Sequence, residues 1–284
     1  MAEKTKGQEL SEQLLMNRKS IPEAKRGILE AANEFAEGYK RFLSNKTERE
    51  VIDYVLPILK ERGYKEYVRG EVAEAGSKFY KVNRDKNIVM CTKGRRPVAE
   101  GVRVTVAHID SPRLDFKPHP LFEDASMAFF KTHYYGGIKK YQWTTIPLSI
   151  RGVVYTKDGS KVKIKIGEEE DEPSFLITDL LPHLAQNQMR KGASEIVEGE
   201  QLNLLIGSIP YDDEKVKDKV KLAVMQILNE KYGITEGDFE TAELCAVPAF
   251  KPRDMGFDRS MVAAYGQDDS SCAYAEFMAE LDTV

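Results

Sequence analysis

The stretch Val102-Arg-Val-Thr-Val-Ala-His-Ile-Asp-Ser-Pro-Arg-Leu-Asp115 decides how we interpret the fold. Its first half alternates valine with polar residues, which predicts a buried strand that ends near His108. His108 and Asp110 are two positions apart, so on an extended backbone both side chains leave the same face. Pro112 should end the strand, because proline has no N–H to donate to a neighbouring strand.

His108 and Asp110 are residue types that a zinc site uses. A neutral imidazole binds zinc through one ring nitrogen, and a carboxylate that accepts the other ring N–H fixes the tautomer and raises the basicity of the ligand. A histidine at a strand end is more often only a polar terminus. The pair therefore suggests a metal site without establishing one.

Composition and charge limit the class of protein. The chain has 284 residues, 42% hydrophobic and 31% charged, which is typical of a globular protein with one large domain or two smaller ones. The net charge of −4 gives no general attraction to nucleic acid or to an anionic membrane, so we expect neither as a partner. The basic run Lys93-Gly-Arg-Arg96 is interpreted as a turn.

Cysteine usage and the N-terminus predict a cytoplasmic protein. Cys91, Cys245 and Cys272 are scattered and include no Cys-x-x-Cys, so neither a disulfide framework nor a thiolate zinc site is indicated. The first residues are too polar for a signal peptide, and no apolar run has the length of a membrane span.

Hydrophobic periodicity and turn residues predict most of the secondary structure. The expected elements are helices over residues 21–43, 47–63 and 213–232, strands over 79–82, 87–92 and 243–248, and a hairpin of 148–155 with 161–166 around Asp158-Gly159. Thr47 with Glu50 has the form of a capping box, and Pro57 should kink or break the helix that follows. The acidic run Glu168–Glu172 is expected to be a solvated loop.

A second candidate site lies in Ala264-Tyr-Gly-Gln-Asp-Asp-Ser-Ser-Cys-Ala273. Asp268 and Asp269 open an apolar run that should be helical. Acidic residues at this place commonly cap a helix and interact with its dipole. The alternative is that one of the two carboxylates bridges two metal ions.

Three long strings give the chain a family resemblance. His108-Ile-Asp-Ser-Pro-Arg-Leu-Asp115, Lys131-Thr-His-Tyr-Tyr-Gly-Gly-Ile-Lys-Lys-Tyr-Gln-Trp143 and Tyr265-Gly-Gln-Asp-Asp269 resemble the aspartyl aminopeptidase family, in particular its bacterial members. The resemblance covers nearly the whole chain from about Thr47 onward.

The resemblance implies a fold, an activity and an assembly. The family consists of cytosolic dinuclear zinc exopeptidases that remove N-terminal residues from peptides, often acidic ones, and that assemble into tetrahedral dodecamers. Its fold is an α/β catalytic domain interrupted by a β-rich domain used in subunit contacts. By this resemblance we expect residues 1–112 and 242–284 to be catalytic domain, and residues 113–241 to be the inserted β-rich oligomerisation domain. Peptide substrates and other copies of the chain are the implied partners.

The resemblance also implies roles for individual residues. His108 matches a ligand of one zinc, Asp110 the carboxylate behind it, and Asp268 the ligand that bridges both zincs. The peptide bond between Asp268 and Asp269 is a place to look for a cis bond. His183 is similar to the histidine of the inserted domain that enters a neighbouring subunit's active site, although a surface or interface histidine explains it as well.

Two functions follow for a chain that ends at Val284, 16 residues after Asp268. In the family the general base, usually Glu, and further ligands follow the bridging Asp. The chain is then expected either to belong to a two-zinc aminopeptidase or to be a truncated homologue that keeps the assembly domain without catalysis. A serine or cysteine hydrolase is less supported, because there is no Gly-x-Ser-x-Gly and no cysteine with a histidine near it in sequence.

Overall fold

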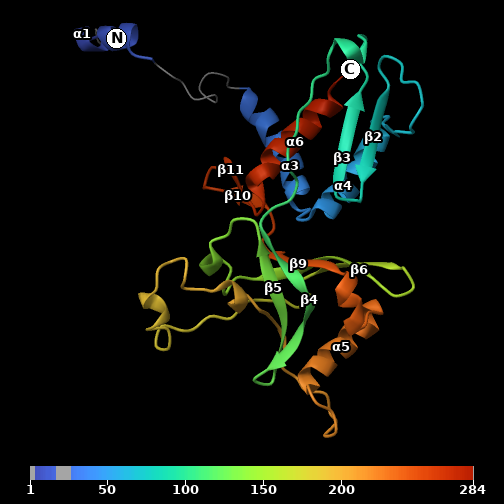
Figure 1. The fold of residues 1–284 in the computed structure, drawn as a ribbon. Helices are drawn as coiled ribbons and strands as arrows, with labels where there is room; N and C mark the ends of the chain where they lie inside the picture. The colour runs from blue at the N-terminus through green and yellow to red at the C-terminus, as the bar shows by residue number, and fades with distance from the viewer. Residues whose placement is uncertain (1–3, 17–26, 284) are drawn as a thin grey trace.

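Two sheets organise the chain, and they lie at opposite ends of the view in Figure 1. The computed structural model describes residues 4–16 and 27–283. A three-stranded sheet packs with helices in the upper part of the view, and a six-stranded antiparallel sheet packs with one long helix in the lower part. The fold is therefore of the mixed α/β class that the sequence predicted.

The upper part, here called the helical unit, joins an early and a late part of the chain in one core. It contains α3 (Ile28–Leu43), α4 (Glu48–Glu61), β1 (Lys65–Glu66), β2 (Lys78–Asn83), β3 (Asn87–Thr92) and α6 (Gln267–Leu281). α6 contacts both α3 and β3. The apolar side chains of this core are Phe42, Val51, Val55, Leu59, Tyr64, Tyr80, Ala273, Tyr274, Phe277 and Leu281.

The start of α4 has one half of the predicted capping box. Thr47 Oγ1 accepts a hydrogen bond from the Glu50 N–H at 3.4 Å, and the Glu50 carboxylate accepts one from the Lys46 N–H at 2.9 Å. The first bond uses an N–H group that the helix itself leaves unpaired, and the second holds the residue just before the N-cap, whereas a capping box would use the N–H of Thr47. The helix continues across Pro57 to Glu61, so the break that we considered there is absent.

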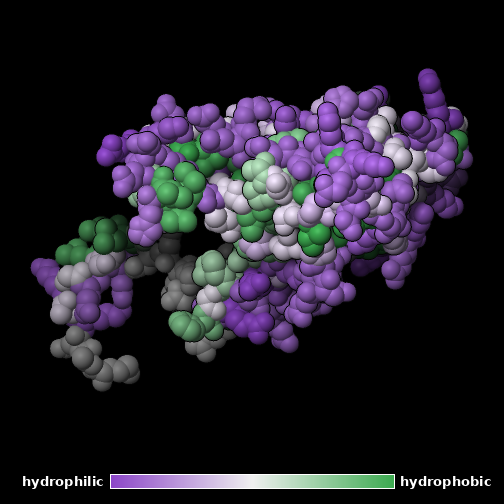
Figure 2. Space-filling model, turned by 90° about the horizontal axis from the view of Figure 1, so that it is seen from below, coloured by the Kyte–Doolittle hydropathy of each residue, from purple (hydrophilic) through white to green (hydrophobic). Residues whose placement is uncertain are grey.

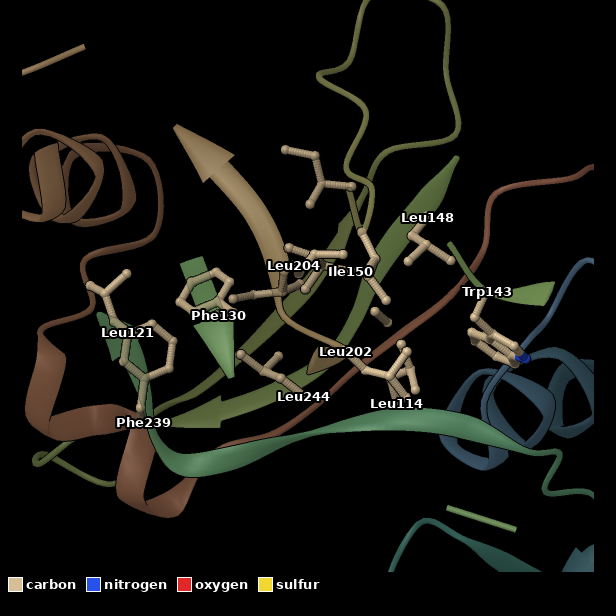
Figure 3. Close-up of a cluster of buried hydrophobic side chains, with 14 of the residues drawn as sticks. Leu114, Leu121, Phe130, Trp143, Leu148, Ile150, Leu202, Leu204, Phe239 and Leu244 are labelled. Atoms are coloured by element: carbon tan, nitrogen blue, oxygen red, sulfur yellow. The ribbon is translucent and has the colours of Figure 1, made fainter. Parts of the chain in front are cut away.

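The lower part, here called the sheet unit, has the strand order β7-β6-β9-β4-β5-β8. Its elements are β4 (Arg113–Asp124), β5 (Met127–Tyr135), β6 (Leu148–Tyr155), β7 (Lys161–Ile166), β8 (Leu204–Gly207), α5 (Lys219–Tyr232) and β9 (Glu243–Pro248), with 3-10 turns η2 (Lys140–Gln142), η3 (Gln188–Arg190), η4 (Gly199–Gln201) and η5 (Glu236–Thr241). Figure 3 shows part of its core, with Leu114, Leu121, Phe130, Trp143, Leu148, Ile150, Leu202, Leu204, Phe239 and Leu244. The outer face seen in Figure 2 is mostly hydrophilic, with apolar side chains in small groups.

β9 changes where we place the second domain boundary. It begins at Glu243, after the expected boundary at residue 241, yet it pairs with β6 and β4 inside the sheet unit. On strand pairing alone the sheet unit reaches Pro248. The first boundary coincides with the start of β4 at Arg113. The division into domains itself stays a prediction.

The strand predicted over Val102–His108 is wrong. This segment is irregular between the turn η1 (Val98–Glu100) and β4, and no strand of the described residues pairs with it. Val104 is 73% exposed. A segment with an alternating pattern forms a strand only where a partner strand supplies hydrogen bonds to its backbone. The alternation alone does not show whether such a partner exists.

The remaining elements differ from the predictions mainly at their ends. α5 begins at Lys219, six residues after the predicted start at Asp213, and it ends at Gly233 as expected. The predicted residues 21–26 lie outside the described part of the chain. α1 (Lys6–Leu14) and the hairpin of β10 (Arg253–Met255) with β11 (Met261–Ala263) complete the fold. In the described ranges, no helix is long and apolar enough to cross a membrane.

Candidate metal centre

The candidate site forms where the segment before β4 meets the start of α6. Tyr265 Oη donates a hydrogen bond to the carbonyl oxygen of Pro112 at 2.8 Å, and Ser111 Oγ donates to the carbonyl oxygen of Asp268 at 3.4 Å. Gly266 has a φ of +78°, and a Cβ on it would lie 2.9 Å from Ser111 Oγ. The close approach therefore requires glycine at this position.

His108 and Asp268 face each other across this junction. His108 Nε2 lies 3.3 Å from Asp268 Oδ1. A nitrogen and an oxygen that share one tetrahedral zinc, at bond lengths of about 2.0–2.2 Å, lie about 3.4 Å apart. The two atoms are thus spaced as two ligands of one ion would be. The Asp268 side chain is 95% exposed, so its carboxylate is open to cations.

The other ring nitrogen of His108 is held by Asp110. His108 Nδ1 lies 2.9 Å from the main-chain oxygen of Asp110 and 3.3 Å from its carboxylate Oδ1. Both neighbours are acceptors, which favours a proton on Nδ1, and Nε2 is the ring nitrogen that faces Asp268. Asp110 thus approaches this ring nitrogen with both its carbonyl and its carboxylate.

The Asp110 carboxylate is in turn held by Tyr135, the last residue of β5. Tyr135 Oη donates a hydrogen bond to Asp110 Oδ2 at 2.7 Å. Partial burial acts to raise the pKa of Asp110, but this hydrogen bond, one from the backbone, and the charges of His108 and Arg113 outweigh it and keep the pKa below its usual value. Asp110 therefore stays ionised, as a group that accepts a ring N–H should.

The local charges also act on His108. Slight burial acts to lower the pKa of the imidazole, whereas the Asp110 carbonyl and carboxylate, with Asp269 and Asp268, raise it above its usual value. The site is thus a region of negative charge around one half-exposed imidazole. Such a region attracts a cation.

The comparison with known families decides the class. The model of the family described as "Aminopeptidase I zinc metalloprotease (M18)" matches residues 42–284. The chain belongs to the M18 family. The match includes the segments of His108 and Asp268 as well as the sheet unit, so it is not confined to the predicted assembly domain.

Several bacterial M18 proteins are similar to the chain. The "Probable M18 family aminopeptidase 1" of Clostridium acetobutylicum is 51% identical over 249 residues, which are 86% of this chain and 54% of that protein. The protein of the same name from Thermotoga maritima is 47% identical over 253 residues, which are 89% of this chain and 55% of that protein. The chain thus spans about half the length of the curated relatives it matches.

Solved M18 structures match the fold of both units. The crystal structure of the M18 aminopeptidase from Thermotoga maritima has a TM-score of 0.88 at 44% identity, and it covers 95% of this chain and 59% of that one. The structure of aminopeptidase I from Borrelia burgdorferi has a TM-score of 0.80 at 41% identity, and it covers 96% of this chain and 61% of that one. The M18 fold of this chain is therefore supported independently of the sequence strings.

The M18 chain brings together three of the four predicted site residues. His108, Asp110 and Asp268 meet at the junction, and the peptide bond between Asp268 and Asp269 is cis, as the resemblance suggested. His183 is exposed in a turn of the sheet unit and is not part of this junction. Within the described residues, no group of three or more His, Cys, Asp or Glu side chains has the geometry of a metal site.

Local sequence carries no signal for the residues that hold the candidate ligands in place. Tyr135, Ser111 and Gly266 lie in the strings that carried the resemblance, but spacing gives them no role. Tyr135 and Asp110 are 25 positions apart and meet only because β5 runs back along β4. The strand pairing reveals this contact, and the local sequence around either residue does not.

Proposed function

We propose that this chain supplies part of the active site of a zinc aminopeptidase, in which His108 binds one zinc ion and Asp268 is shared between two. The observation that carries the proposal is the 3.3 Å separation of His108 Nε2 and Asp268 Oδ1, which fits two ligands of one zinc. The M18 membership supports the choice of metal and of reaction class.

The residues present have distinct tasks in this proposal. Asp110 fixes the imidazole so that Nε2 presents its lone pair, and an ionised Asp110 raises the basicity of that nitrogen. Asp268 offers one oxygen on the side of His108, and its exposure leaves the other oxygen available for a second ion. When bound, zinc lowers the pKa of a coordinated water toward about 7 and polarises the scissile carbonyl.

The remaining ligands and the general base are part of the same proposal. A catalytic zinc usually takes three protein ligands, whereas His108 and Asp268 are two. By resemblance to the family, the other ligands and a glutamate base follow the bridging Asp. The glutamate would take the proton from the attacking water.

Substrate, assembly and location are also proposals. We propose that the substrates are peptides with an acidic N-terminal residue, which rests on the family resemblance. We propose a homo-oligomer in which the turn with His183 reaches a neighbouring subunit and contacts its substrate, since Leu180, Leu181 and Leu184 around His183 are all more than half exposed. Such an apolar group is typical of an interface. The composition and scattered cysteines support a cytoplasmic location.

Hydrolysis assays on the full gene product test the function. Aspartyl, glutamyl and leucyl fluorogenic amides would be compared before and after chelation and after zinc is returned. We expect hydrolysis that is fastest for the acidic substrates, is lost on chelation and is restored by zinc. His108→Ala should abolish it, whereas His133→Ala, a change of an exposed histidine on β5, should leave it intact. Activity that survives chelation, or that survives His108→Ala, would overturn the proposal.

A further inference from the structure

Tyr135 links the sheet unit to the candidate metal ligand. Its hydroxyl donates to Asp110 Oδ2 at 2.7 Å, while the other carboxylate oxygen of Asp110 lies 3.3 Å from His108 Nδ1. The two oxygens of one carboxylate are thus divided between a tyrosine of β5 and the imidazole. With one oxygen held by Tyr135, the other has fewer ways to turn away from the ring.

The position of Tyr135 is itself fixed by its neighbours. It pairs with Arg113 at the end of the β4–β5 ladder, and the Arg113 guanidinium lies over its ring at 4.5 Å. Arg113 is held by Asp115 at 2.7 Å and by Glu48, in the first turn of α4, at 2.9 Å. The tyrosine ring therefore sits under a cation that is anchored in both units.

The backbone after Tyr135 adds a second constraint. Gly136 has a φ of +74°, and a Cβ on it would lie 3.2 Å from the Pro112 ring and 3.4 Å from Pro112 Cα. The end of β5 is thus packed directly on the segment that carries His108 and Asp110. The hydroxyl of Tyr135 reaches Asp110 across a rigid contact between backbones.

We infer that Tyr135 is a positioning residue for His108, acting through Asp110. This inference rests on the proposed function, since it treats His108 as a metal ligand. Groups that hold a metal-bound histidine or its carboxylate typically change metal affinity by about 10- to 100-fold when they are removed. Through Tyr135, the sheet unit, which we expect to form subunit contacts, also orients the proposed metal ligand His108.

The test is Tyr135→Phe, which removes one hydroxyl and keeps the ring under Arg113. We expect the affinity of the full gene product for Co²⁺, measured by titration of its visible absorption, to fall by about 10- to 100-fold. Long-range ¹⁵N–¹H spectra should show His108 as the Nδ1–H tautomer in the unaltered chain and as a tautomer mixture in the variant. Tyr134→Phe is the matched control, because Tyr134 is the adjacent tyrosine of β5 and stacks on His133 instead. It should change neither measurement.

A double-mutant cycle separates positioning from general loosening of the fold. If Tyr135 acts through Asp110, Asp110→Asn combined with Tyr135→Phe should bind Co²⁺ as weakly as Asp110→Asn alone. The double variant could instead bind Co²⁺ more weakly than Asp110→Asn alone, by the factor that Tyr135→Phe gives by itself. Tyr135 would then act by another route, and the inference would be overturned. Co²⁺ affinity and a tautomer that are both unchanged in Tyr135→Phe would overturn it as well. Failure of the unaltered full gene product to bind Co²⁺ would instead overturn the proposed function, and with it the ligand role of His108.

Discussion

Arg151, fully buried on β6, donates a hydrogen bond to Glu50 in the first turn of α4 at 2.7 Å, and this contact joins the two units. The Arg151 Nη2 atom lies 2.5 Å from Glu168, whose other oxygen pairs with Lys46. Lys46 also donates to the carbonyl oxygens of Pro248 and Phe250. Burial lowers the pKa of Lys46, although Glu168 acts in the opposite direction. Four charges thus form one network at the boundary between the units.

Removing the Glu168 charge should destabilise the chain strongly. Glu168→Gln leaves Lys46 and Arg151 buried as cations with only Glu50 to compensate them. Breaking a buried pair in this way typically costs about 3–5 kcal/mol. Urea denaturation followed by circular dichroism would measure the free energy of unfolding.

Glu169→Gln is the matched control for that experiment. Glu169 pairs with Lys251 at 2.8 Å, and both side chains are more than half exposed. An exposed pair contributes about 0–1 kcal/mol. Equal losses for Glu168→Gln and Glu169→Gln would contradict the buried network.

Gly38 should not tolerate a methyl group. A Cβ on Gly38 would overlap the hydroxyl of Tyr274 where α3 crosses α6. We expect Gly38→Ala to lower the free energy of unfolding by about 1–3 kcal/mol, because it overpacks the contact. In an open helix the same change would stabilise by about 1 kcal/mol. Thermal denaturation in the Tyr274→Phe background should recover most of the loss. An equal loss in both backgrounds would place the strain elsewhere.

The unpaired segment before β4 should favour self-association of the chain. Val102, Val104 and Val106 are exposed on a segment without regular structure, and no described strand pairs with it. Unpaired backbone N–H and C=O groups beside apolar side chains can pair with strands of other molecules, and a lysine opposes this pairing. Val104→Lys should therefore reduce association in sedimentation velocity, with a change in unfolding free energy of at most about 0.5 kcal/mol. Val98→Lys, in the preceding turn, is the control and should leave association unchanged. A large loss of stability in Val104→Lys would show that this side chain is buried after all.

Local sequence predicted the elements whose causes are local. The cap at Thr47, the stop at Gly233 and the Asp158-Gly159 hairpin each depend on residues within a few positions of one another. β4 and β5 were not predicted individually, and Pro118 and Pro120 hide the strand pattern of β4. The register shifts between Phe116 and Leu121, which accommodates these prolines.

Features that depend on distant partners could not be predicted in this way. Glu168 belongs to an acidic run that composition assigns to solvent, yet Lys46, 122 positions earlier, makes it a buried partner. Tyr135 gains its contact with Asp110 only through the pairing of two strands. The candidate site was reached because the family resemblance connected His108 with Asp268, which no spacing rule does.

The most direct test of the metal centre is an anomalous difference map at the zinc edge from crystals grown with zinc. We predict a peak within about 2.0–2.2 Å of both His108 Nε2 and Asp268 Oδ1. A map in which the zinc peaks lie only at other residues, or in which His108 and Asp268 are too far apart to share an ion, would contradict the account.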